Sequence, residues 1–280
     1  MDSRFASHME RWRLNDPNVF DMMDEEDEML KTLQQKGYDH EDAFLDHLKA
    51  LGKSVIYIER ASPEEMQRRT RAAMASGTDI IAQGYLERDN FGGLADFLVK
   101  VSGTSNLGNF HYEVWDTKLS RKIKPYFAIQ LCCYAEMLEC EQGIRPQHVA
   151  IVLGSNEIVS LRVQDYFAYY VSLKTSFLAF QDAWSSNDKP DPADSVSFGR
   201  WSNYAKEILL KRRHLSLVAN IRRSQIKRLE EAGLKTIDEL AKTSLDFIPK
   251  LNSDIFERLK AQAKIQIISE GQDKPSFEVL

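Results

Sequence analysis

Three strand-like segments follow one another between residues 79 and 119, and this run constrains the fold more than any other feature of the sequence. They are DIIAQGYLE (79–87), GLADFLVKV (93–101) and FHYEVWDTKL (110–119). Their β-branched and aromatic residues favour extended chain, and the links RDNFGG and SGTSNLGN are rich in turn formers. The sequence therefore predicts a sheet that contains three successive antiparallel strands.

Helical segments surround this run. Apolar residues at helical spacing, Pro near the start and Gly at the end predict helices over 31–52, 63–77, 125–143 and 165 to about 185. Further strands are expected over 54–59, 148–154 and 157–163, and the last two form a hairpin around Ser155 and Asn156. The predicted fold class is α/β, with a mixed sheet flanked by helices.

The polar stretch SSNDKPDPADS (185–195) resembles a linker, because Pro, Asp and Ser cluster there and little strand signal follows. We place a boundary near residue 190, with domains at 1–189 and 190–280. Within the second domain, a helix, a turn at Gly233 and a second helix capped by Thr236, with Glu239 three residues on, predict a small helical hairpin. The C-terminal domain is therefore expected to be all-α.

Composition restricts the possible functions only mildly. The net charge of -5 gives no global attraction to nucleic acid, so phosphate binding would need a local basic surface or a metal. No apolar run approaches the roughly 20 residues that span a bilayer, and no secretory h-region follows the start, so we expect a cytoplasmic protein without membrane contact. Cys132, Cys133 and Cys140 lie in one apolar segment and are interpreted as buried free thiols.

Two carboxylates interrupt the strand patterns. Asp96 lies in GLADFLVKV and Asp116 in YEVWDTKL, where an isolated charge is costly to bury and a shared cation would compensate both. Mg²⁺ and Mn²⁺ prefer such oxygen ligands. Lys118 is two residues beyond Asp116 and so projects from the same face of the strand, where its ammonium can orient water or neutralise a phosphate. Taken alone, D-x-K also fits an exposed ion pair between strand neighbours.

The order of these residues along the chain is more specific than the pair alone. It reads Gly37-x-x-His40-Glu41, Gly93-x-x-Asp96, Asp116-x-Lys118 and Gln130-x-x-x-Tyr134. This order resembles the RecB-like nucleases of the PD-(D/E)xK superfamily, including the CRISPR-associated RecB-like exonucleases. The resemblance implies a restriction-endonuclease-like core in which a helix, three strands, a helix and a further strand follow in sequence.

The resemblance also implies roles for individual residues. Asp96 and Asp116 would bind Mg²⁺ or Mn²⁺, His40 would join the metal shell, and Lys118 would be the catalytic lysine. Gln130 and Tyr134, four apart on one helix face, would hold the lysine or the nucleic-acid backbone. Three alternatives stay open: His47 could be the imidazole that matters, Lys124 and Tyr126 could contact a substrate strand, and Glu113 could ligate metal. Glu113 is treated as structural, because its parity relative to Asp116 places it on the opposite face.

The C-terminal part resembles the helix-hairpin-helix-like region that follows the catalytic core in a subgroup of bacterial RecB-like predicted nucleases. Such units bind the DNA backbone through turn amides, helix N-termini and nearby cations. The candidate nucleic-acid contacts are Arg222, Arg223, Lys227 and Arg228, within a basic cluster that also contains Lys211, Arg212 and Arg213.

One departure from the resembled family concerns its cofactor. Many relatives place cysteines around a tryptophan here to hold an iron–sulfur cluster, whereas this chain has Val196, Gly199 and Trp201. Without thiolates at these positions the cluster would have no ligands, so we expect no iron–sulfur cluster.

The function expected from these features is a Mg²⁺- or Mn²⁺-dependent deoxyribonuclease, exonuclease-like, that acts on single-stranded DNA or duplex ends in repair, defence or mobile-element processing. One alternative is a noncatalytic nucleic-acid-binding module that works beside a helicase or another DNA-processing protein. Another is an unrelated α/β protein in which D-x-K occurs by chance.

Overall fold

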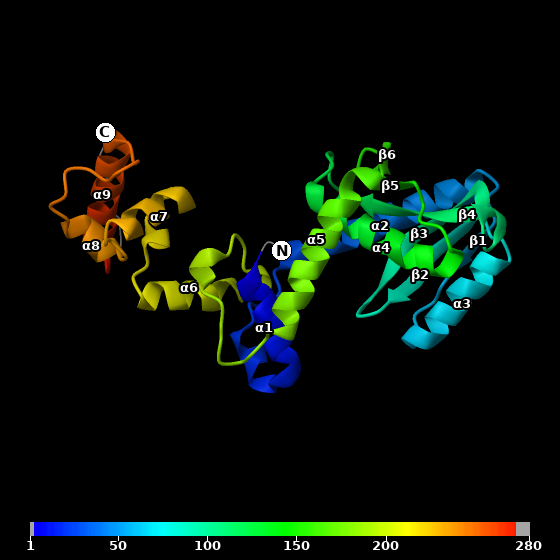
Figure 1. Ribbon diagram of the computed structural model, residues 1–280, viewed down its shortest axis with the longest axis horizontal. Coiled ribbons are helices and arrows are strands. Elements are labelled where there is room, and N and C mark those ends of the chain that lie inside the picture. The colour runs from blue at the N-terminus through cyan, green and yellow to red at the C-terminus, as the bar shows by residue number, and fades with distance from the viewer. Residues whose placement is uncertain (1–2, 273–280) are drawn as a thin grey trace. The chain divides into compact units, whose positions relative to one another are not determined.

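The computed structural model describes residues 3–272 and divides the chain into two compact units. The sheet unit comprises Glu26–Ala179, and the helical unit comprises Met1–Glu25 together with Phe180–Leu280. Figure 1 shows the elements of both units. The first 25 residues thus belong with the C-terminal helices, whereas the sequence-based boundary groups them with the sheet.

The sheet unit contains a six-stranded mixed sheet whose spatial order follows the sequence. Its strands are β1 (Val55–Tyr57), β2 (Ile80–Arg88), β3 (Phe91–Ser105), β4 (Gly108–Lys118), β5 (His148–Leu153) and β6 (Ile158–Arg162). The pairs β1–β2 and β4–β5 are parallel, and the other neighbours are antiparallel. The predicted run of three successive antiparallel strands is confirmed as β2, β3 and β4.

Four helices accompany these strands: α2 (Glu28–Ala50), α3 (Pro63–Ala75), α4 (Pro125–Gln142) and α5 (Gln164–Asp182). Capping residues explain where two of these helices begin or end. Ser62 caps α3 by accepting a hydrogen bond from the amide of Glu65, and α4 ends where Gly143 takes a left-handed φ of 74°. The α/β class with a mixed sheet flanked by helices is therefore confirmed.

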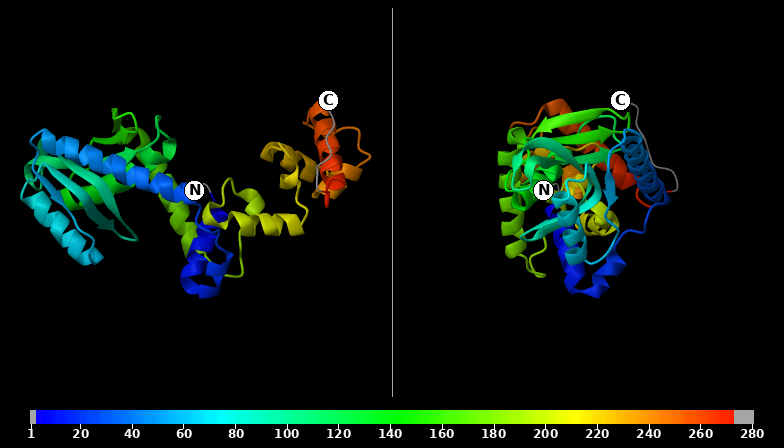
Figure 2. Two further views of the ribbon diagram at one scale, coloured as in Figure 1. Left: turned by 180° about the vertical axis from the view of Figure 1, so that it is seen from behind. Right: turned by 90° about the vertical axis from the view of Figure 1, so that its right-hand side faces the viewer.

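The helices cover both faces of the sheet (Figure 2). On one face, Phe44, Leu45 and Leu48 of α2 pack against Ile80, Phe97 and other buried strand residues. On the opposite face, α3 and α4 pack against residues that include Leu98, Tyr112 and Val114. Because side chains alternate along a strand, the even-numbered positions of β4 face α4, and Asp116 and Lys118 belong to this set.

The end of β4 passes very close to the chain after β5. A Cβ at Gly154 would lie 2.5 Å from the carbonyl oxygen of Leu119, which is a backbone atom that cannot rotate away. We therefore expect Gly154→Ala to lower the free energy of unfolding by about 1–3 kcal/mol, measured by thermal denaturation.

Gly37 provides the matched control, since a Cβ there would meet nothing within 4 Å and the residue lies inside α2. Gly37→Ala is expected to stabilise the protein by about 0.5–1 kcal/mol, because alanine loses less conformational entropy in a helix. Equal effects of the two variants would contradict the close approach at Gly154.

The helical unit contains the remaining elements: α1 (Arg4–Asn15), η1 (Pro17–Met22), η2 (Pro192–Asp194), η3 (Gly199–Trp201), α6 (Ser202–Lys211), η4 (Leu215–Leu217), α7 (Arg223–Glu231), α8 (Ile237–Lys242) and α9 (Ser253–Ile268). One apolar cluster joins α1 to α6 around Trp201, whose indole N–H donates to Glu10 Oε1 at 2.9 Å. A second cluster lies among η4 and α7 to α9. The expected C-terminal helices are confirmed.

The segment in which the resembled family places cluster-binding cysteines is thus packed through Trp201 and aromatic neighbours. The three cysteines lie on α4 in the sheet unit, and they differ in exposure: Cys132 is buried, Cys133 is half-buried and Cys140 is exposed. The expectation that all three are buried is therefore wrong for Cys140. Among the residues that the structure describes, no helix is long and apolar enough to cross a membrane.

Candidate active site

Asp96 on β3 and Asp116 on β4 lie opposite each other. The antiparallel register pairs Phe97 with Trp115, so the next position along both strands brings the two aspartates together. Asp116 is only 3% exposed, whereas Asp96 is half-buried. The two strand segments in which the sequence analysis found these carboxylates are therefore neighbours in the sheet.

Lys118 lies beside this pair. Its Nζ is 2.5 Å from Oδ2 of Asp116, in an ion pair without hydrogen-bond geometry, and it lies 5.5 Å from the centre of the Phe127 ring on α4. The side chain is 23% exposed, so the ammonium is reachable from solvent. The predicted common orientation of Asp116 and Lys118 is therefore present.

The environment favours the neutral form of Asp116. Burial is the largest cause, the charge of Asp96 acts in the same direction, and Lys118 opposes them. Together they raise the pKa of Asp116 to about 7. A proton or another positive charge is thus needed to stabilise this pair of carboxyl groups at neutral pH.

Thr117 fixes the position of Asp96 and was not singled out from the sequence. Its backbone N–H and its hydroxyl both donate to Oδ2 of Asp96, at 2.8 and 3.0 Å. These two bonds orient one carboxylate oxygen of Asp96 toward β4. The residue between Asp116 and Lys118 faces the other side of the strand, so only the structure shows that it holds the neighbouring aspartate.

Glu41 is a third carboxyl group near both aspartates. Burial raises its pKa to about 7, with further contributions from the charges of Asp96 and Asp116. The side-chain amide of Gln83 donates to Oε1 of Glu41. The sequence motif contains Glu41 next to His40, but the candidate site residues did not include it.

Gln83 occupies an irregular position in β2. Its φ of 54° is unusual for a residue other than glycine, and the β2–β3 register pairs Ala82 with Phe97 and Gly84 with Ala95. Gln83 therefore stands opposite Asp96 without regular pairing, and its side chain reaches Glu41 on α2. A polar residue inside the apolar run DIIAQGYLE is the sequence signal that could have indicated this position.

The histidine assignment is not supported by a close contact between His40 and either aspartate. His40 Nε2 lies 3.5 Å from the carbonyl oxygen of Val152 on β5. His47 is exposed near the end of α2, where its ring packs beside Phe44.

Glu113 lies on the opposite face of β4 from Asp116, with a carboxylate oxygen 3.9 Å from His148 Nδ1. The interpretation of Glu113 as structural agrees with this placement.

Tyr134 of α4 anchors the beginning of β3 to the site. Its hydroxyl donates to the carbonyl oxygen of Leu94 at 2.7 Å, and a Cβ at Gly93 would lie 2.7 Å from the same hydroxyl. Burial and the charges of Asp116 and Asp96 raise the pKa of Tyr134 to about 12. Gln130, one turn before Tyr134 on α4, is exposed. Of the two residues of the predicted motif, Tyr134 is thus the one that holds β3.

The donor set suits a hard cation with few protein ligands. Within residues 3–272, no group of three or more His, Cys, Asp and Glu side chains is arranged to hold a metal ion. Mg²⁺, however, usually keeps several waters and binds through one or two carboxylates plus substrate phosphates. Asp96 and Asp116, which lie side by side and need positive charge, fit that requirement.

The chain after Lys118 carries further exposed cations and apolar groups. Arg121, Lys122 and Lys124 are exposed, and Tyr126 is 53% exposed beneath the Lys124 ammonium. Lys124 and Tyr126 were the two residues here that the sequence indicated as possible strand contacts. Aromatic rings and cations together are suited to unpaired nucleotides.

The predicted basic cluster of the helical unit is divided by ion pairs. Lys211 pairs with Glu207, Arg212 with Asp191, Arg213 with Asp238 and Glu270, and Arg228 with Glu231. For the described residues, no ion pair is formed by Arg222, Arg223 or Lys227. Within this predicted cluster, the unpaired positive charge therefore lies at the beginning of α7.

The turn between α7 and α8 offers fewer free backbone N–H groups for a phosphate than its resemblance to a helix-hairpin-helix unit implies. The N–H groups of Lys235 and Thr236 both donate to Oε2 of Glu239, at 2.7 and 3.0 Å. These amides already have a carboxylate as their acceptor. A phosphate would have to displace Glu239 to use them.

The chain matches no protein-family model and no curated protein. Its functional interpretation therefore depends on the residues and geometry described above.

Proposed function

We propose that this protein is a Mg²⁺- or Mn²⁺-dependent deoxyribonuclease of the RecB-like PD-(D/E)xK kind. The observation that carries the proposal is the placement of Asp96 and Asp116 side by side on adjacent strands, with Lys118 paired to Asp116 on the same face of β4. The element order α2, β1, α3, β2, β3, β4, α4 and β5 supports a restriction-endonuclease-like core. With β1 and α3 inserted after the first helix, it contains the helix, three strands, helix and strand of that family in sequence.

Each residue has a physical task in this proposal. A bound Mg²⁺ or Mn²⁺ would supply activation of water and neutralisation of phosphate charge. Asp96 and Asp116 would hold the cation, with Thr117 fixing the orientation of Asp96. The Lys118 ammonium would donate to a phosphate oxygen or position the attacking water. Glu41, held by Gln83, adds a third carboxyl group beside the aspartates.

The test is cleavage of end-labelled DNA, single-stranded and duplex, with Mn²⁺, Mg²⁺ or EDTA. We expect cutting with either cation and none with EDTA. Asp96→Asn should lower the rate by roughly 100-fold or more, because loss of a metal-binding carboxylate removes several kcal/mol of charge stabilisation.

Glu113→Gln is the matched control, since it removes a carboxylate from the same sheet on the opposite face, and it should cut like the parent. A parent that binds DNA and Mn²⁺ but never cuts would instead select the noncatalytic module. Equal cutting by parent and Asp96→Asn would remove the aspartate pair from the mechanism.

A further inference from the structure

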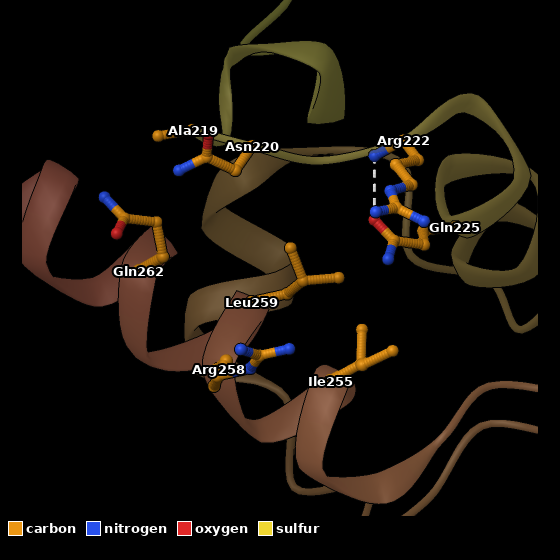
Figure 3. A pocket seen from close by; sticks show the side chains of 8 residues that line it. All are labelled: Ala219, Asn220, Arg222, Gln225, Ile255, Arg258, Leu259 and Gln262. Atoms are coloured by element: carbon orange, nitrogen blue, oxygen red, sulfur yellow. Dashed lines mark hydrogen bonds between the residues drawn. The ribbon is translucent and has the colours of Figure 1, made fainter. Parts of the chain in front are cut away.

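A hollow of about 330 Å³ lies in the helical unit between the beginning of α7 and one side of α9 (Figure 3). Ile255 and Leu259 of α9 project into it from one side. Its polar lining comprises Arg222, Arg258, Asn220, Gln225 and Gln262. The hollow therefore combines two cations and three side-chain amides with an apolar floor, which is formed by Ile255 and Leu259.

The positive charge of this hollow has no counter-ion among residues 3–272. Neither Arg222 nor Arg258 forms an ion pair with a described residue, and both are exposed. Among the described residues that line the hollow, none is Asp or Glu. Arg212 and Arg213 of the same unit, by contrast, are paired with carboxylates. Both arginines of the hollow thus carry charge without a described counter-ion, in a chain whose net charge is negative. An anionic ligand would supply the missing charge.

The walls are held in place by hydrogen bonds. Gln266 accepts from the Ala219 amide at 2.8 Å and donates to the Leu217 carbonyl at 2.8 Å, which fixes the chain before Asn220. At the other side, Gln225 accepts from the Arg222 amide at 2.7 Å, the bond drawn in Figure 3. A preformed hollow costs less ordering entropy on binding than a loose surface does.

We propose that this hollow binds one nucleotide of a DNA single strand. The phosphate lies between Arg222 and Arg258, the base packs on Ile255 and Leu259, and the amide side chains lie at its polar edge. The inference rests on the proposed function in taking DNA as the ligand. It assigns Arg258, which lies on α9 and outside the predicted basic cluster, to nucleic-acid binding.

The apolar floor favours a single strand over a duplex. In a duplex the base faces are stacked on their neighbours, so inserting one of them into a hollow requires unstacking at a cost of a few kcal/mol. An unpaired base already exposes its face and can pack on apolar side chains. A site for duplex phosphates alone would have no need of Ile255 and Leu259.

The experiment measures binding of the full chain to fluorescently labelled probes in EDTA, by anisotropy over a range of salt concentrations. The probes are a thymidine 12-mer, the same length of abasic sugar-phosphate, and a duplex. Arg258→Gln should weaken binding of the thymidine 12-mer by about tenfold and lower the salt slope by about 0.7. Lys264→Gln, which removes an exposed charge elsewhere on α9, should bind like the parent.

A second variant tests whether the base packs on the apolar floor of the hollow. Ile255→Gln should weaken the thymidine 12-mer while leaving the abasic probe unchanged, with circular dichroism as the check on folding. If that variant does not fold, the comparison of the two probes with the parent protein replaces it. The parent should bind the thymidine 12-mer at least about fivefold more tightly than the abasic probe. Equal binding of both probes by the parent, or equal affinities of Arg258→Gln and Lys264→Gln, would overturn the inference.

The result is separable from the nuclease proposal, because binding in EDTA does not depend on cleavage. A chain that binds through Arg258 but never cuts DNA keeps this inference and loses the nuclease assignment. A chain that cuts DNA while Arg258→Gln binds like the parent loses this inference alone.

Discussion

Lys118→Met is expected to lower DNA cleavage by roughly a thousandfold while leaving Mn²⁺ binding at least as tight as in the parent. The ammonium pairs with Oδ2 of Asp116 at 2.5 Å, so removing it frees that oxygen for a cation. The same change removes the positive charge that would stabilise the phosphate in the transition state, for which losses of this order are typical. Methionine keeps the apolar stem beside Phe127.

Cleavage rate and Mn²⁺ affinity, the latter by electron paramagnetic resonance titration, are measured on the same preparation. Lys53→Met is the control, because it removes an exposed lysine that follows the end of α2. If Lys118→Met cut like Lys53→Met, the lysine would have no role in the reaction. Loss of Mn²⁺ binding together with cleavage would make its role structural.

Asp116→Asn is expected to abolish Mn²⁺ binding and cleavage, and also to stabilise the metal-free protein at pH 8. Burial and the charge of Asp96 raise the pKa of Asp116 to about 7, well above its ordinary value of 3.8. The folded chain therefore holds a proton between about pH 4 and pH 7 that the unfolded chain has lost, so this group's contribution to stability falls as the pH rises through that range.

Asparagine removes the ionisation and keeps the shape. We expect the free energy of unfolding to rise by about 1–3 kcal/mol at pH 8 and to change little at pH 4, where the parent carboxyl is already neutral. Thermal denaturation in EDTA at both pH values measures the effect. Asp165→Asn, which removes an exposed carboxylate paired with Arg162, should show no such pH dependence. A variant less stable than the parent at pH 8 would contradict the stated cause.

The periodicity of apolar residues, together with Pro and Gly at helix ends, was enough to predict most elements of the sheet unit. Alternation in FHYEVWDTKL predicted both β4 and the common face of Asp116 and Lys118, because neighbouring side chains in a strand point to opposite sides. Pro125 and Gly143 marked α4, where a fixed φ suits a helix start and a left-handed residue ends it. These are local preferences, so a single sequence contains them.

Contacts between distant segments were decided by the tertiary structure. Glu41 on α2 meets Gln83 on β2, and Thr117 on β4 holds Asp96 on β3, yet no spacing within one element indicates either contact. The same holds for Arg222, which precedes α7, and Arg258 on α9, which line one hollow.

The sequence by itself thus determined the order of most elements of the sheet unit and the common direction of Asp116 and Lys118 on β4, because both follow from local backbone geometry. Only the tertiary structure decided which carboxyl groups share a buried site and which cations are already paired, since pairing depends on the register and packing of segments far apart in the chain. Phe5, Met9 and Val19 illustrate this, because they share one apolar cluster with Trp201, about 180 or more residues further along the chain.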